Sequence, residues 1–250
     1  MAHKRSRIRV SHLGEDLSVE TMQPIVCAQA LVKHYRRGKV DVPALRGMSF
    51  TQAAGEFIML TGESGSGKST FLNLCGCLDG PDDGTLTLFG QDVGSLTDSS
   101  RARLRKEKIG FIFQDFHLIP VLSALENVAY ALKLRGESST FARASAALAK
   151  VGLGNHLHAQ VNALSGGQMQ RVAIARALVS EPALVLADEP TANLDTHNKE
   201  QIMHLLQSMC RSQRAAVLLI THDLSLSQWA DRVVVLRDGK VISDEHTLDH

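Results

Sequence analysis

Two apolar patterns alternate along this chain. Short continuous apolar runs, typical of strands buried on both faces of a sheet, lie at residues 56–60, 183–187, 216–220 and 232–237. Apolar positions with helical spacing lie at residues 69–77, 196–211 and 224–230. Because strands and helices alternate, the sequence predicts an α/β domain with a mainly parallel sheet and helices on both faces.

Two other regions depart from this pattern. Shorter β-rich runs at residues 24–30, 48–52, 85–89 and 108–113 predict further strands. From residue 123 to about residue 180 the apolar spacing is helical, which predicts a helical subdomain at about 115–165. It would be inserted into a single domain that spans residues 25–245, after a polar, poorly ordered arm at residues 1–24.

Composition narrows the class of protein. The chain has 250 residues and a formal net charge of +1, so no basic field marks DNA or RNA as a partner. No apolar run approaches the roughly 20 residues that cross a bilayer, and the N-terminus lacks the apolar stretch of a secretory signal. The scattered cysteines suit reduced thiols: Cys27, Cys75, Cys77 and Cys210. We therefore expect a cytoplasmic protein that binds no nucleic acid.

A glycine-rich segment follows the strand predicted at residues 56–60 and fits the pattern GxxxxGK[ST]. It consists of Gly62, Glu63, Ser64, Gly65, Ser66, Gly67, Lys68, Ser69 and Thr70. Glycines let backbone N–H groups face phosphate oxygens, and the next helix points its positive N-terminal end at them. We predict that Lys68 neutralises the β- and γ-phosphates of ATP and that the Ser69 hydroxyl binds Mg²⁺. The alternative is a chance match in a glycine-rich turn.

An apolar run at residues 184–187 ends in two carboxylates, Asp188 and Glu189. In a P-loop fold such a strand lies beside the phosphate loop. Asp188 would then hold Mg²⁺ through water, and Glu189 would contact the attacking water as general base. The alternative is a strand that runs into an acidic turn.

A second candidate anion site begins the helical pattern after residue 164, at Ser165, Gly166, Gly167 and Gln168. Ser165 could be an ordinary N-cap, but Ser-Gly-Gly also leaves free N–H groups at a positive helix end. One chain seldom needs two sites for the γ-phosphate. We therefore expect a homodimer in which each chain completes the nucleotide site of the other.

Together these motifs resemble those of the ATP-binding cassette (ABC) family. Residues 62–69 look like its Walker A motif, 164–168 like its signature and 184–188 like its Walker B motif. Further positions match in the family's order: Tyr35, Gln114, the triplet Asn193-Leu194-Asp195, and His222. The resemblance covers about residues 25–240. It implies a P-loop NTPase fold of ABC ATPase type, whose mainly parallel core carries an antiparallel β subdomain and a helical subdomain.

The resemblance also implies a role for each of these further residues. Tyr35 would stack on adenine, and Gln114 would sense Mg²⁺ and the γ-phosphate. His222 would bind the γ-phosphate, and Asp195 would lie in a loop that crosses the dimer interface. Ordinary alternatives are a half-buried strand tyrosine, a polar strand end, a surface histidine and a helix cap.

A narrower resemblance points to the lipoprotein-release and macrolide-export branch of the family. It rests on residues 76–79, 109–120, 124–128 and 187–195, and on a short insert at 38–45. It implies a subunit on the cytoplasmic face of the inner membrane that drives transmembrane permease subunits on separate chains, in export, lipid or lipoprotein extraction, or mechanotransmission. The apolar residues after Gln114 would dock a partner helix: Phe116, Leu118, Ile119 and Leu122.

Two other classes of function are weighed against this one. A soluble ABC ATPase that acts on DNA or ribosomes usually carries a coiled-coil insertion, tandem cassettes or strongly basic segments, and the sequence shows none. A small-molecule P-loop kinase is disfavoured by the signature and by the pairing of Glu189 with His222. Phosphorylated product in place of free phosphate would indicate such a kinase.

Overall fold

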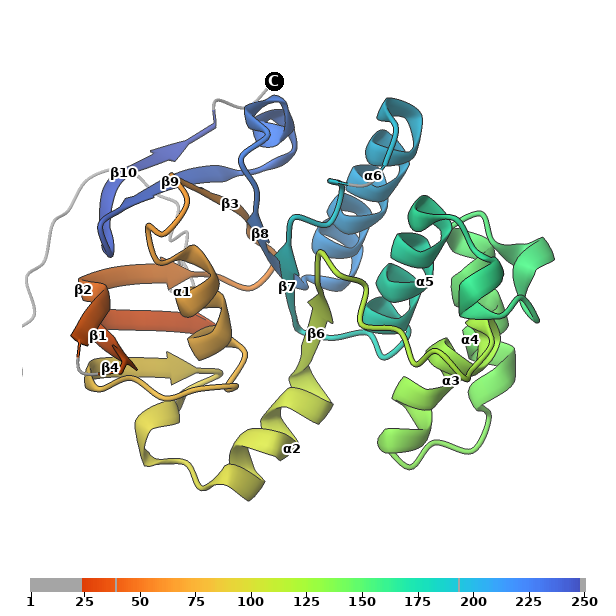
Figure 1. Cartoon of the computed structure of the whole chain (residues 1–250), viewed down its shortest axis with the longest axis horizontal. Coiled ribbons are helices and arrows are strands. Elements are labelled where there is room, and N and C mark those ends of the chain that lie inside the picture. Colours follow the sequence, from red (N-terminus) through yellow and green to blue (C-terminus); the bar gives the residue numbers. More distant parts are fainter. Residues whose placement is uncertain (1–23, 39, 193, 248–250) are drawn as a thin grey trace, which may run out of the picture.

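Two sheets and a group of helices make up the protein in the computed structural model, which describes residues 24–38, 40–192 and 194–247. In Figure 1 the antiparallel sheet lies on the left, the larger sheet crosses the middle, and helices α3, α4 and α5 lie on the right. The arm predicted at residues 1–24 falls outside the described residues except for Pro24.

In chain order, with η for a 3₁₀ helix, the elements are β1 (Val26–Arg37), β2 (Val40–Gln52), β3 (Phe57–Thr61), α1 (Lys68–Cys75), β4 (Asp83–Leu88), β5 (Gln91–Asp92), η1 (Val93–Ser95), α2 (Asp98–Lys108), β6 (Ile109–Ile112), α3 (Ala124–Leu134), α4 (Thr140–Lys150), η2 (Gly154–His156), η3 (Val161–Ala163), α5 (Gly166–Leu178), β7 (Leu184–Asp188), α6 (Thr196–Gln213), β8 (Ala216–Ile220), η4 (Leu224–Trp229), β9 (Arg232–Arg237) and β10 (Lys240–His246).

The larger sheet is the predicted parallel core. Its strands lie in the order β10-β9-β3-β8-β7-β6, and neighbours are parallel except for β10 and β9. Ile58 and Leu60 of β3 belong to one buried cluster, together with α1. Phe57 and Met59 belong to a second cluster, together with α5 and α6. Both faces are therefore covered, which explains why the strand sequences are continuously apolar.

The smaller sheet is antiparallel, in the order β2-β1-β4-β5. Strands β1 and β2 are longer than predicted, because β1 continues to Arg37 and residues 40–45, interpreted as part of an insert, belong to β2. Polar residues and three register shifts along the β1–β2 pair hide the period-two pattern that would have indicated a long hairpin. The ring of Phe50 on β2 meets that of Phe71 on α1 edge-on, with centroids 5.0 Å apart.

Three further differences have local causes. Helix α2 was not predicted, because Leu104 is its only buried residue and the sequence shows no apolar stripe. Strand β10 was missed because its residues are all exposed or half-buried. The helix predicted at 224–230 is the 3₁₀ helix η4.

Across the described residues, no helix combines the length and apolar character needed to cross a bilayer.

Arg232 at the start of β9 joins the two sheets and is only 8% exposed. Its guanidinium donates to Glu56 Oε1 and Asp244 Oδ1, both at 2.6 Å, and to the carbonyl of Thr51 on β2 at 3.1 Å. Removing one partner of a buried ion pair leaves the other charge uncompensated, which costs more than the pair itself contributes.

Replacing Arg232 with methionine is therefore expected to lower the free energy of unfolding by about 3 kcal/mol, measured by urea unfolding. Arg211→Met is the matched control. Arg211 pairs with Asp231 at 2.7 Å, but its side chain is 65% exposed, and such surface pairs contribute about 0–1 kcal/mol. Equal losses in the two variants would contradict the weight given to burial.

Candidate functional site

The glycine-rich segment forms a tight loop between β3 and the N-terminus of α1. Gly62 has φ 147°, and a Cβ there would lie 2.1 Å from the carbonyl oxygen of Leu236 on β9. Gly67 caps α1 with φ 107°, where a Cβ would lie 2.5 Å from the carbonyl oxygen of Ala44. Only glycine fits at these two places, so the neighbouring strands themselves fix the loop's shape. This shape leaves the N–H groups at the N-terminal end of α1 free to bind an anion.

Lys68 is the first residue of α1 and bends back over the loop. Its ammonium donates to the carbonyls of Gly62 and Glu63, each at 2.8 Å. Both acceptors belong to the loop itself, so the charge is held at the mouth of the phosphate-binding loop. A phosphate placed there would meet a cation and the N–H groups of the loop together.

A hollow of about 970 Å³ of atom-free space, part of it open to solvent, lies in front of this loop. It gathers predicted residues from four separate parts of the chain. Its lining residues are Ala44, Gly62, Ser64, Gly65, Gly67, Lys68, Ser69, Thr70, Gln114, Asp188, Glu189, Ile220 and His222. Glu63 and Ser66 lie in the loop but not in this lining. Ala44 and Ile220 were not predicted, because nothing in their apolar side chains indicates a polar site.

Side chains with oxygen atoms that could bind a metal ion line the hollow. Ser69 Oγ donates to Asp188 Oδ2 at 3.3 Å, and Gln114, directly beyond β6, lines the same space. Burial raises the pKa of the Asp188 carboxyl, against the opposing hydrogen bond from Ser69. A divalent cation would favour the charged carboxylate and offset that cost of burial.

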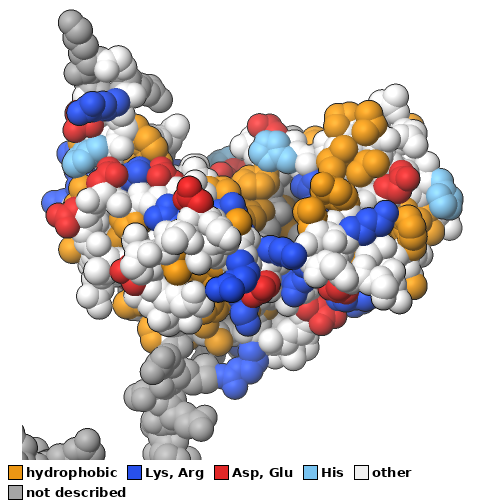
Figure 2. Space-filling model, turned by 90° about the horizontal axis from the view of Figure 1, so that it is seen from below, with side chains coloured by type: hydrophobic (Ala, Val, Ile, Leu, Met, Phe, Trp, Pro, Cys, Tyr) orange, Lys and Arg blue, Asp and Glu red, His pale blue; other side chains and the backbone are white. Residues whose placement is uncertain are grey.

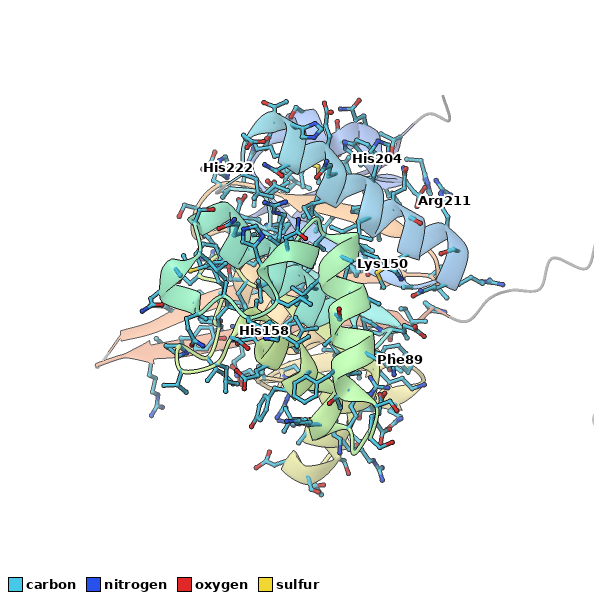
Figure 3. All side chains as sticks on the ribbon, turned by 90° about the vertical axis from the view of Figure 1, so that its right-hand side faces the viewer. Phe89, Lys150, His158, His204, Arg211 and His222 are labelled. Atoms are coloured by element: carbon cyan, nitrogen blue, oxygen red, sulfur yellow. The ribbon has the colours of Figure 1, made fainter. Side chains whose placement is uncertain are left out.

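This donor set fits Mg²⁺ better than a metal held by protein alone. Over the part of the chain that the structure describes, no group of three or more His, Cys, Asp and Glu residues could hold a metal ion. Mg²⁺ is usually bound by one or two carboxylates together with substrate phosphates. His204 on α6, labelled in Figure 3, packs its ring edge-on against that of Trp229, with centroids 4.4 Å apart.

Glu189 and His222 lie together at the ends of adjacent parallel strands, β7 and β8. Glu189 Oε1 is 2.7 Å from His222 Nδ1 and accepts from the backbone N–H of His222 at 3.0 Å. Thr221 Oγ1 donates to Oε2 at 3.0 Å. The Glu189 side chain is 15% exposed, whereas that of His222 is 79% exposed. Thr221 was not predicted, although it directly precedes the candidate histidine.

Tyr35 lies on β1, beside the loop but outside the lining of the hollow. Its hydroxyl donates to Asp79 Oδ2 at 3.1 Å and also interacts with Thr70. The Lys33 ammonium lies 5.5 Å from the ring centroid and pairs with Asp79 at 2.9 Å. Burial raises the pKa of the Tyr35 hydroxyl. The residue is still 37% exposed, so part of its side chain is accessible to a ligand.

The signature residues begin α5, away from the hollow. Ser165 caps the helix, and Gln168 completes a capping box by accepting from the Ser165 N–H at 2.8 Å. A Cβ on Gly166 would meet no atom within 4 Å. Within one chain, this open helix end does not share a pocket with Lys68.

Asp195 is the N-cap of α6. Its two carboxylate oxygens accept from the backbone and side chain of Asn198, at 2.9 and 2.7 Å. Asp195 is thus a helix cap, as the ordinary alternative predicted, and a cap can also lie at a dimer interface. Asn193 lies outside the described residues.

Known proteins resemble this chain over most of its length. A family model described as "ABC transporter" matches residues 45–192. The "Lipoprotein-releasing system ATP-binding protein LolD" of Hydrogenovibrio crunogenus is 45% identical over 226 residues, which cover 90% of this chain and 98% of that protein. The "Macrolide export ATP-binding/permease protein MacB" of Syntrophobacter fumaroxidans is 47% identical over 217 residues, but the chain spans only 30% of its length.

A solved structure is similar over nearly the whole chain. It is the ATP-binding cassette MJ0796 in a dimeric post-hydrolysis state bound to ADP and Pi. The TM-score is 0.86 at 39% identity, with 90% of this chain and 100% of that chain covered. The family model covers more than half of the sequence, and the LolD relative is matched almost end to end. The chain belongs to the ABC transporter family and is an ATPase subunit of that family.

Proposed function

We propose that this ATPase binds ATP with Mg²⁺ in the hollow before α1 and uses hydrolysis to drive transmembrane partner subunits. The observation that carries the proposal is the meeting of Lys68, Asp188 and Glu189 around one space at the ends of β3 and β7. Lys68 supplies positive charge to the phosphates. Glu189, which lines the same hollow, would accept a proton from a water that attacks the terminal phosphorus.

Ser69, Asp188 and Gln114 are the proposed residues for Mg²⁺. The ion, when bound, would neutralise charge that develops on the phosphate oxygens. In this structure Glu189 is held by His222 and Thr221. We propose that His222, with its exposed ring, moves to the γ-phosphate when nucleotide binds and thereby frees one Glu189 oxygen for the water. The adenine would stack on the ring of Tyr35, a residue that is 37% exposed.

We further propose that the active form is a homodimer. The N-terminal end of α5 is exposed at Ser165 and open at Gly166, and it does not share the hollow of its own chain. A second chain could bring this end to the γ-phosphate, with Asp195 at the interface. Sedimentation of the purified chain with and without ATP tests this, and a monomer at saturating ATP, with hydrolysis blocked, would contradict it.

The proposed contact with membrane subunits is an apolar groove beyond Gln114. Its walls come from β6, α3, the loop between them, the end of α2 and the end of α5 with Arg176, and its atom-free space is about 1250 Å³, part of it open to solvent. Its apolar lining includes Ile109, Phe111, Phe113, Ile119, Tyr130 and Leu134. In Figure 2 hydrophobic side chains and a cluster of Lys and Arg share the face seen from below. Exposed apolar grooves of this kind accept amphipathic helices.

Of the four apolar residues expected to dock a partner helix, only Ile119 lines the groove, and Phe116, Leu118 and Leu122 do not. Leu118 is half-buried and packs against the subunit's own core. Ile119→Asp is therefore expected to leave the isolated subunit folded and active but to abolish assembly with the membrane subunits or their stimulation of ATPase activity. Co-purification and phosphate release measure both. Val121→Asp, at a residue 82% exposed and outside the groove lining, is the control, and normal assembly of Ile119→Asp would contradict the docking site.

The names of the relatives suggest the kind of transport. One belongs to a lipoprotein-releasing system and another to a macrolide exporter. We propose that this chain works at the cytoplasmic face of the inner membrane, in export or in extraction of lipids or lipoproteins. Purification of the intact complex from membranes, with its subunits identified by mass spectrometry, tests this. Recovery with DNA or ribosomes and without membrane subunits would favour the soluble class instead.

A further inference from the structure

The loop that follows Gln114 adopts a backbone conformation that side chains disfavour. Phe116 and His117 are consecutive residues with φ of 60° and 48°. The left-handed region is costly for a residue with a Cβ, and it persists only where the surroundings hold it. The turn brings the His117 ring to 4.7 Å from that of Phe113. Something must therefore hold the chain in place directly beyond Gln114.

Arg176, in the last turn of α5, holds this turn. Its guanidinium donates through Nη2 to the carbonyl of Phe116 at 2.8 Å and through Nη1 to the carbonyl of His117. Among the described residues Arg176 forms no ion pair with a carboxylate. Burial lowers the pKa of the guanidinium, so these two carbonyls supply the polar contacts that its charge requires. The planar fork suits two adjacent acceptors.

A second residue of α5 contacts the loop on the other side of Gln114. Gln170 is 1% exposed, and its Nε2 lies 3.5 Å from the carbonyl oxygen of Phe113. Farther along, the side-chain amide of Asn127 on α3 accepts from the Ile119 N–H through Oδ1 and donates to the Ile119 carbonyl through Nδ2. Gln114 itself stays exposed and lines the nucleotide hollow. The glutamine is thus a free side chain on a backbone that α5 holds on both sides.

The opposite end of α5 carries Ser165 and its open N-terminus. The helix has 13 residues, and at about 1.5 Å per residue it is a rod of roughly 20 Å. A displacement of the signature end therefore reaches the Arg176 end with little loss. Because Arg176 is bonded to the turn, the same displacement would move the backbone next to Gln114.

We infer that Arg176 is a positioning residue that sets the place of Gln114 in the nucleotide hollow and links it to the position of α5. The inference rests on the function proposed above for Gln114. Arg176 does not touch the phosphates, so its loss acts through the glutamine. ATP still binds, but hydrolysis slows because one ligand of the reacting centre is misplaced. A misplacement of about 1 Å can cost roughly 10²-fold in rate.

The test is a double-mutant cycle on the full chain with Arg176→Gln, Gln114→Ala and the double variant. Steady-state phosphate release gives kcat and KM, and melting temperature reports folding. Arg176→Gln is expected to lower kcat by about 10²-fold with KM for ATP unchanged. In the Gln114→Ala background the same change should add less than about twofold, since groups that act as one unit are not additive.

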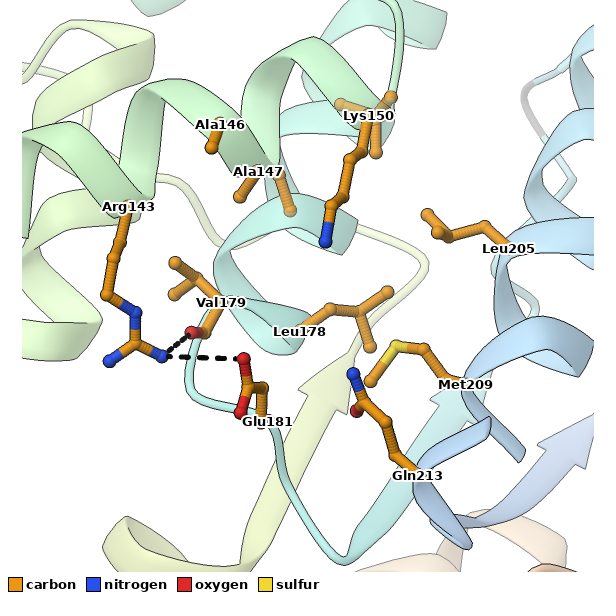
Figure 4. Close-up of a pocket in the computed structure, with 12 residues that line it drawn as sticks. Arg143, Ala146, Ala147, Lys150, Leu178, Val179, Glu181, Leu205, Met209 and Gln213 are labelled. Carbon is orange, nitrogen blue, oxygen red and sulfur yellow. Dashed lines mark hydrogen bonds and ion pairs between the residues drawn. The ribbon is translucent and has the colours of Figure 1, made fainter. Parts of the chain in front are cut away.

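Arg143→Gln is the matched control. Arg143 on α4 also donates to a backbone carbonyl near the end of α5, that of Val179 at 2.7 Å, and it lies close to Glu181 (Figure 4). Among the described residues, Arg143 forms no hydrogen bond or ion pair with the loop beyond Gln114, so Arg143→Gln should keep wild-type kcat. Because Arg176→Lys keeps the charge but not the fork, it takes the place of Arg176→Gln if the latter does not fold.

Three results would overturn the inference. The first is wild-type kcat in Arg176→Gln. The second is that Arg176→Gln lowers kcat by its full factor in the Gln114→Ala background as well. The third is that neither Arg176→Gln nor Arg176→Lys folds, which would make the arginine purely structural. If Gln114→Ala hydrolyses ATP normally, the role proposed for Gln114 fails first. If Gln114→Ala is impaired but Arg176→Gln adds its full loss in that background, the role of Gln114 stands and only the inference about Arg176 fails.

Discussion

Replacing Glu189 with glutamine is expected to leave ATP binding intact and to lower hydrolysis by about 10²–10⁴-fold, the range typical for loss of a general base. The substitution keeps the shape of the side chain and its contact with Thr221, but it removes the charge and the basicity. The carboxylate lies at the end of β7 against the nucleotide hollow, so the effect should fall on kcat and not on the ATP dissociation constant. Phosphate release and nucleotide titration measure the two separately.

The same variant should accumulate as an ATP-bound dimer, because the step that releases it is blocked. Size-exclusion chromatography with ATP tests this. Glu181→Gln is the matched control: Glu181 precedes β7, has a similar φ of 50° against 46° for Glu189, and lies outside the hollow. Wild-type turnover by Glu189→Gln, or an equal loss in Glu181→Gln, would remove Glu189 from the role of base.

Replacing Lys68 with alanine is expected to weaken ATP binding strongly and to abolish measurable hydrolysis. The ammonium is held at the loop by two carbonyls at 2.8 Å, where it would face the β- and γ-phosphates. Its loss removes attraction to the bound phosphates and, more strongly, to the charge that develops on them in the transition state, so affinity and turnover should fall together.

Lys150→Ala is the comparison for that experiment. Lys150 is an exposed lysine at the end of α4, on the side of the molecule shown in Figure 4, and it lines no part of the nucleotide hollow. It should bind and hydrolyse ATP normally. Fluorescent-nucleotide titration and phosphate release measure both variants, and unchanged values for Lys68→Ala would contradict the assignment of the phosphate loop.

The sequence was sufficient to predict features that depend only on residues close together in the chain. The loop at residues 62–67 could be recognised because its glycines, its lysine and the flanking strand and helix are all contiguous. The capping roles of Ser165 and Asp195 follow from side chains that bond to N–H groups three residues away. The strands β3, β7 and β8 were visible as apolar runs because both of their faces are buried.

Contacts between distant segments could not be predicted from the sequence. The reason that Gly62 must be glycine is the carbonyl of Leu236, which lies 174 positions away in the chain and has no pattern to reveal it. The network of Tyr35, Lys33 and Asp79 and the bonds from Arg176 to the turn at Phe116 likewise join residues more than 40 positions apart. Helix α2 and strand β10 carry too few buried residues to produce a periodic signal.

Sequence alone was enough to identify the family and its ATPase activity and to nominate candidate site residues, because phosphate binding depends on a contiguous loop and on strand ends with fixed residue types. Tertiary structure was needed to show that Glu189 is paired with His222 and Thr221, that Ile119 and not Leu118 lines the groove, and that α5 contacts the backbone on both sides of Gln114. These are properties of packing between segments, where burial and direction depend on neighbours that the chain brings together only when it folds.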